Sequence, residues 1–207
     1  MPLSPVTPDS AGDDVKRLYE RFAEAFGAES LPEAFHAYGN CEPFLKDLFM
    51  NAKKFVAGEG KLDARTRVLI GLATAYHAKS AAWAEFLREY AARQGVDEQA
   101  IADGLAVAST NYLYNTFFKF RSLSGTDRFE GLPVALRAHT FAGTSLDDKT
   151  VELINTAVSD LNACEPCVAG HVAKAKNLGL SDEQVLEAIQ CAATVYAGCQ
   201  YLTAASL

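Results

Sequence analysis

Apolar residues recur every three to four positions through most of the chain, which is the spacing of α-helices. Between residues 147 and 161, apolar side chains at positions 151, 154, 158 and 161 keep this period, and acidic residues open the first turn. The segment from Ser181 repeats the pattern and begins with a capping box of Ser181 and Gln184. No segment shows the alternation of a strand between hairpin turns. We therefore expect an all-α protein.

The same periodicity sets the expected helix boundaries. Residues 1–12, rich in Pro, Ser, Gly and Asp, read as a flexible lead-in. A short helix is expected around residues 133–140, inside a Gly- and Pro-containing linker at 121–146. The longer helices are expected at 13–26, 41–56, 63–76, 80–94, 97–120, 147–161 and 165–178, the last closed by Gly179.

The chain resembles itself at a constant separation. Residues 63–70 read like residues 147–154, and Gly95 with its following residues reads like Gly179, each pair lying 84 positions apart, with one extra residue at Ser181. A constant offset across two separate signals indicates duplication. We expect two related multi-helix copies, an N-terminal half at 13–125 and a C-terminal half at 126–207.

The strongest chemical signal is the run that ends at His171, in which Cys164 and Cys167 are separated by two residues. Pro166 favours the start of a helix, which places Cys167 in the first turn and His171 one turn further on the same face. A neighbouring imidazole and the positive end of a helix both favour thiolate over thiol. Because the thiolate attacks peroxides and disulfides or binds metal, the sequence indicates cysteine chemistry in this half.

Glu152 lies twelve residues before Cys164, on the preceding helix. From the pattern alone it is a solvated glutamate, because Asn155, Thr156 and Ser159 share its face. Its functional interpretation requires this polar face to fold over the cysteine turn. Glu152 would then meet His171 and make the imidazole a better base.

In the first copy, the repeat register replaces every reactive position with an unreactive one. The N-terminal half is therefore expected to be a scaffold, and the C-terminal half to carry the chemistry. The pairs are Ser80 with Cys164, Trp83 with Cys167, Leu87 with His171, and Val68 with Glu152.

Two other uses of the cysteine pair are open. The pair could be small residues packed at a helix start, although chance rarely supplies the spacing, the helix start and the histidine together. It could also bind zinc, but a closed zinc site needs four ligands and the motif offers three. The fourth would have to be Cys191, Cys199 or His139, which show no paired ligand spacing.

Composition limits the remaining functions. The chain has 207 residues, 49% of them hydrophobic, with a net charge of −7 and a pI near 5.1. An acidic protein has no general affinity for nucleic acid or anionic membranes. There is no transmembrane-length apolar stretch, and the N-terminus does not read as a signal peptide. We expect a cytoplasmic protein, in which five cysteines are free, catalytic or metal-bound; Cys41, Cys191 and Cys199 are expected to be buried.

The motif as a whole resembles the signature of the alkylhydroperoxidase D family, within the carboxymuconolactone decarboxylase-like superfamily. The resemblance is close over about 50 residues and looser over the two helical copies. It rests on Glu152, Cys164-x-x-Cys167-x-x-x-His171 and Gly179, with Ala157-Val158-Ser159, Asn162 and Ala163 matching around them.

The resemblance implies an AhpD-like helical fold and a peroxidase or thiol-disulfide oxidoreductase without a bound cofactor. Cys167 would attack the peroxide, Cys164 would resolve the sulfenic acid, and His171 with Glu152 would relay the proton. The substrate would be an organic hydroperoxide or hydrogen peroxide, and a dithiol protein would reduce the disulfide. A homo-oligomer, a trimer or a hexamer, is also implied.

One position departs from the family, and one segment has two interpretations. Family members often carry a second histidine directly before the attacking cysteine, where this chain has Pro166. Residues 111–120 resemble an Asn- and aromatic-rich helix end that the family places near the site entrance or a subunit contact, and could equally be aromatic core.

Three rival functions remain. A general thiol-disulfide oxidoreductase would use the same pair. A carboxymuconolactone decarboxylase-like lyase acting on a γ-lactone would not need it. A zinc-stabilised interaction module is the non-enzymatic alternative.

Overall fold

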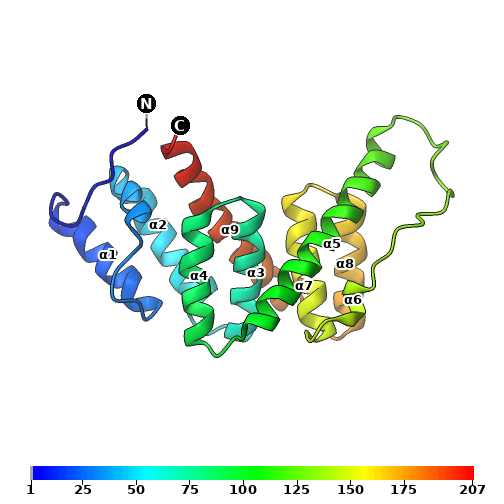
Figure 1. The fold of residues 1–207 in the computed structure, drawn as a ribbon, viewed down its shortest axis with the longest axis horizontal. Coiled ribbons are helices and arrows are strands. Elements are labelled where there is room, and N and C mark those ends of the chain that lie inside the picture. Colours follow the sequence, from blue (N-terminus) through cyan, green and yellow to red (C-terminus); the bar gives the residue numbers. More distant parts are fainter. Residues whose placement is uncertain (1) are drawn as a thin grey trace. The chain divides into compact units, whose positions relative to one another are not determined.

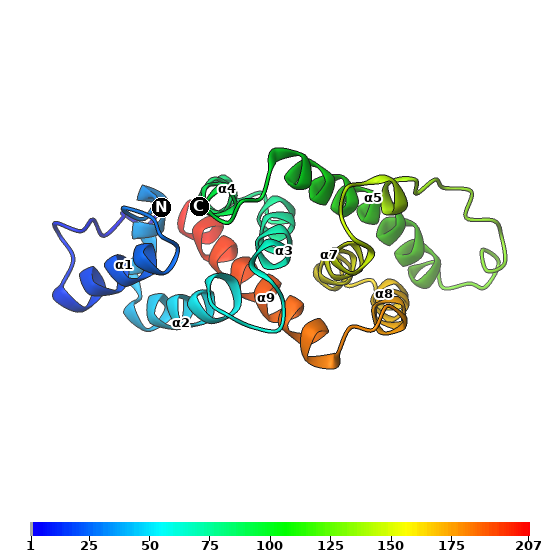
Figure 2. The ribbon, with the colours of Figure 1, turned by 90° about the horizontal axis from the view of Figure 1, so that it is seen from below.

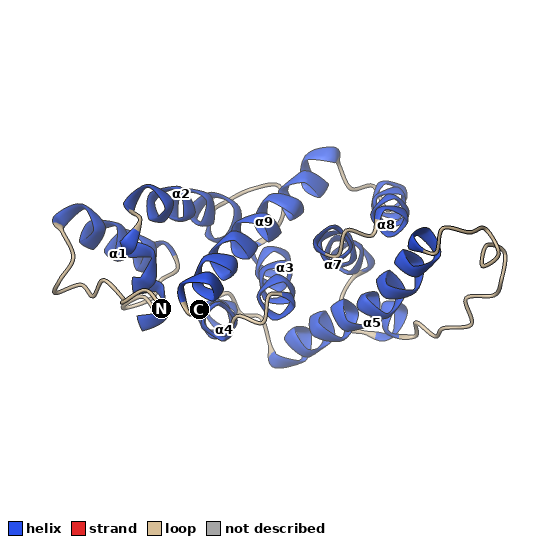
Figure 3. Ribbon diagram, turned by 90° about the horizontal axis from the view of Figure 1, so that it is seen from above, coloured by secondary structure: helices blue, strands red, loops and turns tan. Residues whose placement is uncertain are grey.

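Helices make up the regular secondary structure of the computed structural model, which describes residues 2–207 (Figure 1). Within those residues Figure 3 shows helices and loops and no strand, so the all-α prediction is confirmed. The helices are α1 (Asp13–Ala25), the 3₁₀ helix η1 (Glu33–Asn40), α2 (Glu42–Ala52), the π-helix η2 (Lys53–Ala57), α3 (Ala64–His77), α4 (Ala81–Arg93), α5 (Glu98–Leu123), α6 (Thr140–Gly143), α7 (Asp148–Leu161), α8 (Glu165–Asn177) and α9 (Asp182–Ala205).

The chain folds into two compact units. One unit contains the residues up to Asp97 together with Gln190–Leu207, and the other contains Glu98–Ile189. This division differs from the expected halves at 13–125 and 126–207, because compact units follow packing, whereas the expected halves follow sequence similarity. No helix of the described residues has the length and hydropathy needed to cross a membrane.

The first unit is built around buried aromatic rings. Phe22, Phe35 and Trp83 are fully buried and pack ring against ring with neighbouring aromatic residues. The Trp83 Nε1–H donates to the Tyr38 hydroxyl over 2.8 Å, and that hydroxyl donates to the Gly198 carbonyl over 2.9 Å. Two polar groups that burial would otherwise leave unpaired are thus satisfied inside an apolar core.

In the second unit α7 and α8 form an antiparallel pair and α5 packs against both. Figure 2 shows this pair end-on, with α5 running past it. Asp103 of α5 binds the segment just before α7, since its Oδ2 accepts from the Ser145 backbone N–H over 2.7 Å and from the Ser145 hydroxyl over 2.6 Å. Asp147 then caps α7 by accepting from the Thr150 N–H. These contacts fix where α7 begins.

The duplication is visible in the helix boundaries. Each of α3, α4 and α5 begins 84 residues before its counterpart among α7, α8 and α9, and α3 and α4 also end at that offset. Lys79 and Ala163, the equivalent residues in the turns, both have positive φ, at 55° and 51°. The extra residue expected at Ser181 is absent, because α5 and α9 begin in register and Ser181 is the counterpart of Asp97.

Each unit takes its third helix from the other copy. In the second unit, α5 of the first copy packs on α7 and α8 of the second. In the first unit, the later part of α9 packs on α3 and α4: a Cβ at Gly198 would meet Trp83, and the Cys191 thiol donates to the Arg67 carbonyl. The helix facing the cysteine turn therefore belongs to the half that the sequence predicts to be a scaffold.

Several local predictions are corrected by the structure. Residues 133–138 are not helical, and α6 begins only at Thr140, where the expected helix ended, because Pro133 and the preceding Gly131 belong to an extended linker. The 3₁₀ helix η1 was not expected. Cys41 is exposed at the start of α2 rather than buried. Residues 2–12 of the lead-in contain no helix, as expected, but Leu3 and Val6 donate backbone hydrogen bonds to Ala205 and His36.

Gly198 gives a direct test of the core around Trp83. A Cβ there would lie 2.6 Å from the Trp83 Nε1 atom, whereas one at Gly170, also inside a helix, would meet nothing within 4 Å. We expect Gly198→Ala to lower the free energy of unfolding by about 1–3 kcal/mol through overpacking. Gly170→Ala should raise it by roughly 0.5–1 kcal/mol through helix propensity. Urea unfolding measures both, and equal effects would contradict this description of the core.

The Asp103 contact makes stability depend on pH. Hydrogen bonds from the Ser145 hydroxyl and backbone hold the pKa of the Asp103 carboxyl below its ordinary value. A carboxyl whose pKa is lower in the folded than in the unfolded protein stabilises the fold at any pH above its unfolded pKa. That contribution is lost as the pH falls through the pKa of the folded state. Asp103→Asn should therefore destabilise the protein modestly at pH 7 and progressively less below about pH 4. Unfolding curves across this range test it, with the exposed Asp9→Asn as control; a pH-independent loss would contradict it.

Candidate functional site

The cysteine turn is set by the end of α7. Ala163 adopts the left-handed conformation that closes a helix, and the Cys164 backbone N–H donates to the Ser159 carbonyl over 3.0 Å. Cys164 then serves as the N-cap residue of α8, and Pro166 lies in that helix's first turn. Cys164 thus closes the end of α7 through its backbone N–H and also begins α8 as its N-cap residue. This double role fixes the antiparallel register of the two helices.

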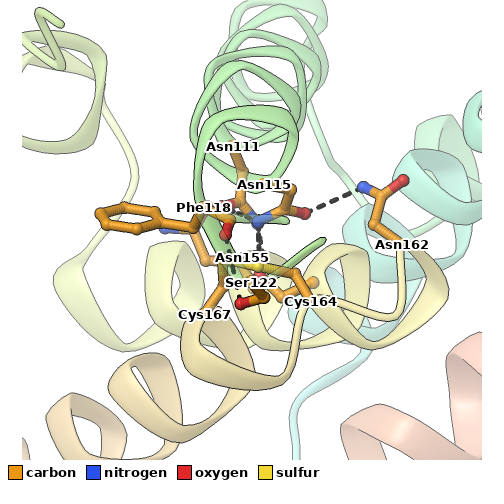
Figure 4. The surroundings of a disulfide bond; sticks show 9 residues. Asn111, Asn115, Phe118, Ser122, Asn155, Asn162, Cys164 and Cys167 are labelled. Atoms are coloured by element: carbon orange, nitrogen blue, oxygen red, sulfur yellow. Dashed lines mark hydrogen bonds between the residues drawn. A yellow bond between two sulfur atoms is a disulfide. The ribbon is translucent and has the colours of Figure 1, made fainter. Parts of the chain in front are cut away.

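Cys164 and Cys167 are joined by a disulfide with an S–S distance of 2.08 Å. Cys164 is fully buried, whereas Cys167 keeps 7% of its surface exposed. Cys167 lies in the first turn of α8 and His171 one turn later, as the spacing predicts. Figure 4 shows the disulfide beneath α5, surrounded mainly by amide side chains.

Glu152 and His171 meet, as the functional interpretation required. The His171 Nδ1 atom lies 2.7 Å from the Glu152 Oε2 atom, and both side chains are buried. A carboxylate only accepts, so Nδ1 carries the hydrogen and Nε2 is left as the basic ring nitrogen. The solvated glutamate that the pattern favoured is therefore wrong, because α7 buries this polar face. The Lys174 Nζ atom lies 3.7 Å from the other Glu152 oxygen.

α5 covers the disulfide with two asparagines of the segment 111–120, which the family resemblance placed near the site entrance or a subunit contact without giving either asparagine a role. Asn111 Nδ2 donates to the Asn155 carbonyl and to the Ser159 hydroxyl, over 2.8 and 2.9 Å. Asn115 Nδ2 donates to Asn111 Oδ1 and to the same hydroxyl, each over 3.1 Å. Asn162 Nδ2 donates to Asn115 Oδ1 over 2.9 Å. The sequence carries one sign of this network. Polar residues lie four positions apart on each helix, at 111 and 115 on α5 and at 155 and 159 on α7, so each pair shares one helical face.

A cavity of about 430 Å³ opens onto the cysteine turn. Cys167 and His171 form part of its wall, and Cys164 does not. Its other walls are mainly apolar, and the Phe141 ring stands edge-on to the His171 ring. The remaining lining residues are Tyr114, Phe118, Ala138, Pro166, Gly170 and Lys174.

The aromatic segment 111–120 is therefore divided by face. Tyr114 and Phe118 line the cavity, while Asn111 and Asn115 are buried beside the disulfide. Leu113 and Phe120 are about half exposed, at 46% and 52%. The segment serves neither purely as core nor purely as an entrance.

The equivalent place in the first copy is filled. Trp83, Leu87 and Val68 are completely buried there and carry no nucleophilic or basic group. Ser80 is the counterpart of Cys164 and contacts Cys199, and burial raises the pKa of the Cys199 thiol to about 12. A thiol with so high a pKa stays protonated at neutral pH, which makes it a poor nucleophile.

The residues proposed as zinc ligands are not assembled. Across residues 2–207, no group of three or more His, Cys, Asp or Glu side chains is arranged to hold a metal ion. The buried Cys191 and Cys199 have partners within the first unit, the Arg67 carbonyl and Ser80. His139 directly precedes α6.

The chain is similar to several known proteins. Residues 128–207 match the model of the Carboxymuconolactone decarboxylase family. An alkyl hydroperoxide reductase AhpD from Anaeromyxobacter sp. is 28% identical over 176 residues, covering 85% of this chain and 89% of the relative. A second AhpD, from Solibacter usitatus, is 35% identical over 105 residues, covering 51% of this chain and 59%, less than two thirds, of the relative.

A solved structure supports the fold. A Burkholderia xenovorans protein assigned as a gamma-carboxymuconolactone decarboxylase subunit superposes with a TM-score of 0.62 at 16% identity, covering 94% of this chain and 97% of its own. At that identity the likeness concerns the fold alone. Residues 128–207 therefore match a carboxymuconolactone decarboxylase family domain, and the chain is similar to AhpD proteins over most of its length.

Proposed function

We propose that this protein is a thiol-dependent peroxidase that reduces hydroperoxides through a dithiol–disulfide cycle of Cys164 and Cys167. The observation that carries the proposal is the unequal access of the two sulfurs. Cys167 lines the cavity together with His171, whereas Cys164 is fully buried behind it. A substrate in the cavity can reach only one of the two cysteines, so Cys167 attacks and Cys164 resolves.

The catalytic cycle balances as follows. His171, oriented by Glu152, takes the proton from the Cys167 thiol. The thiolate attacks the terminal peroxide oxygen and breaks the O–O bond; Cys167 becomes a sulfenic acid, and the alkoxide takes the proton from His171 and leaves as alcohol. The Cys164 thiol then displaces the sulfenic oxygen as water and closes the disulfide. A dithiol protein returns two electrons and two protons and leaves as its own disulfide.

The cavity walls favour an organic hydroperoxide over hydrogen peroxide. Tyr114, Phe118 and Phe141 offer apolar surface that an alkyl or aryl group would bury. Pro166 contributes to the same wall, at the position where the family resemblance implies that a second histidine is common. The relay therefore depends on a single imidazole, which favours slower peroxide reduction and leaves disulfide exchange as the second candidate function.

Assembly and location stay predictions. A homo-oligomer, a trimer or a hexamer, is supported by the exposed Leu113 and Phe120 of α5, which line a shallow, mainly apolar groove. The expected location is the cytoplasm.

Thiol titration tests the roles of the cysteines. After reduction and removal of the reductant, one equivalent of cumene hydroperoxide should remove two thiols from the wild type and form the Cys164–Cys167 disulfide. Cys167→Ser should consume no peroxide rapidly, because the remaining thiols are not activated. Cys164→Ser should still lose one thiol, leaving a trapped sulfenic acid. Equal peroxide consumption by Cys167→Ser and wild type would refute the assignment.

The same experiment separates the second candidate function, disulfide exchange. A wild-type protein that keeps both thiols in the presence of the peroxide, but exchanges disulfides with dithiothreitol, would favour it.

Glu152→Gln tests the relay. The amide can still reach Nδ1 but cannot stabilise a charged imidazole, so the peroxide rate should fall by at least about tenfold, given that general bases contribute roughly 10²–10⁴-fold. Stopped-flow measurement between pH 5 and 9 should show the loss greatest at neutral pH and smaller where hydroxide ionises Cys167 directly. Asp160→Asn is the matched control, an exposed carboxylate near the other end of α7, and should change nothing. A wild-type rate in Glu152→Gln would remove Glu152 from the relay.

A further inference from the structure

One polar side chain beside the disulfide lacks the partners that its neighbours have. Asn155 is completely buried, and neither its Nδ2 nor its Oδ1 atom has a hydrogen-bond partner among residues 2–207. The amide network of α5 reaches only its backbone carbonyl. Figure 4 shows the Asn155 side chain among those that surround the disulfide. A buried carboxamide left in this way costs stability, and such groups call for an explanation.

The register of the two helices places Asn155 level with Cys167. Near one end of the α7–α8 pair the Cys164 N–H bonds to the Ser159 carbonyl, and further along Glu152 bonds to His171. Asn155 lies between Glu152 and Ser159 on the same helical face. Antiparallel helices have the same rise per residue, so a position between Glu152 and Ser159 on α7 faces a position between His171 and Cys164 on α8. For Asn155 this position is next to Cys167.

The chemistry of the pair changes what Asn155 can bind. Sulfur in a disulfide is a weak acceptor, so the carboxamide N–H has nothing to donate to while Cys164 and Cys167 are joined. A thiolate carries a full charge and accepts strong hydrogen bonds. Reduction therefore supplies the partner that the oxidised site withholds.

We propose that Asn155 donates its Nδ2–H to the Cys167 thiolate and so biases the pair toward its reduced, reactive form. The carboxamide disfavours the disulfide by being unpaired in it and favours the thiolate by binding it. It thereby lowers the pKa of Cys167 and makes the disulfide easier to reduce. The inference rests on the cysteine pair cycling between disulfide and dithiol, one part of the proposed function, and does not require that the oxidant be a peroxide.

Asn155→Leu tests this, because leucine has a similar volume and no donor. In equilibrium with dithiothreitol, whose two thiols reduce the disulfide as dithiothreitol becomes its cyclic disulfide, the variant should favour its disulfide about tenfold more than wild type. This corresponds to a reduction potential lower by about 30 mV. In a Cys164→Ser background, Asn155→Leu should raise the pKa of Cys167 by about one unit, read from the pH dependence of alkylation by iodoacetamide.

Stability gives a signature that a purely structural residue would not give. Asn155→Leu should raise the melting temperature of the oxidised protein and lower that of the reduced protein. Ser159→Ala is the matched control on the same helix face: its hydroxyl accepts from Asn111 and Asn115, amides satisfied by other side chains and the backbone. It should lower the stability of both forms alike and leave the potential unchanged. If leucine prevents folding, Asn155→Ala should show the same shifts in potential and pKa.

Two results would overturn the inference. Asn155 variants with wild-type potential and wild-type Cys167 pKa would show that the carboxamide does not bind the thiolate. Equal destabilisation of both redox forms by Asn155→Leu would assign it a structural role. Either result can occur with peroxidase activity intact, and the expected shifts can occur in a protein that exchanges disulfides without reducing peroxides. The two proposals are thus separately testable.

Discussion

The burial of a polar face on α7 is the constraint on which the rest of the second unit depends. Glu152, Asn155, Thr156 and Ser159 are all buried on one helix. Buried polar groups are costly unless they are paired, so this face requires partners from both neighbouring helices. His171 on α8 pairs with Glu152, and the asparagines of α5 pair with Ser159. The same hydrogen bonds therefore pack the three helices together and bring the side chains of the candidate site into contact.

The duplicated half shows what happens when that requirement is removed. The counterparts of Glu152 and His171 are the fully buried Val68 and Leu87, which need no hydrogen-bond partners. Trp83 replaces Cys167 and occupies the space against Gly198, the counterpart of the cavity residue Tyr114. The Trp83 ring against Gly198 fills this space. At the equivalent place, Cys167 and Tyr114 leave a cavity between them and their neighbours. The same backbone arrangement thus supports either a closed core or a cysteine that lines a cavity.

Periodicity predicted most helices to within a few residues, because apolar spacing and capping residues act locally. The capping box of Ser181 and Gln184 formed as expected, and the contact of Glu152 with His171 was anticipated as a possibility. The pattern could not show that the polar face of α7 is inside, since polarity along a helix normally marks the solvent side. It also could not show that α5 crosses to the other copy, because that choice depends on packing between segments distant in sequence.

The exchange of third helices has a consequence for the order in which the chain is completed. The site-bearing unit is one continuous stretch, Glu98–Ile189, and every residue assigned to its chemistry lies between Asn111 and Lys174. The other unit also needs Gln190–Leu207. The hydrogen bond between the Arg67 carbonyl and the Cys191 thiol, for example, joins residues that are 124 positions apart. During synthesis from the N-terminus, the reactive unit can close while the scaffold is still missing its last helix. The unit that contains the cysteine pair is thus built from residues close together in the sequence, whereas the other unit also needs residues 190–207, which lie far from the rest of it.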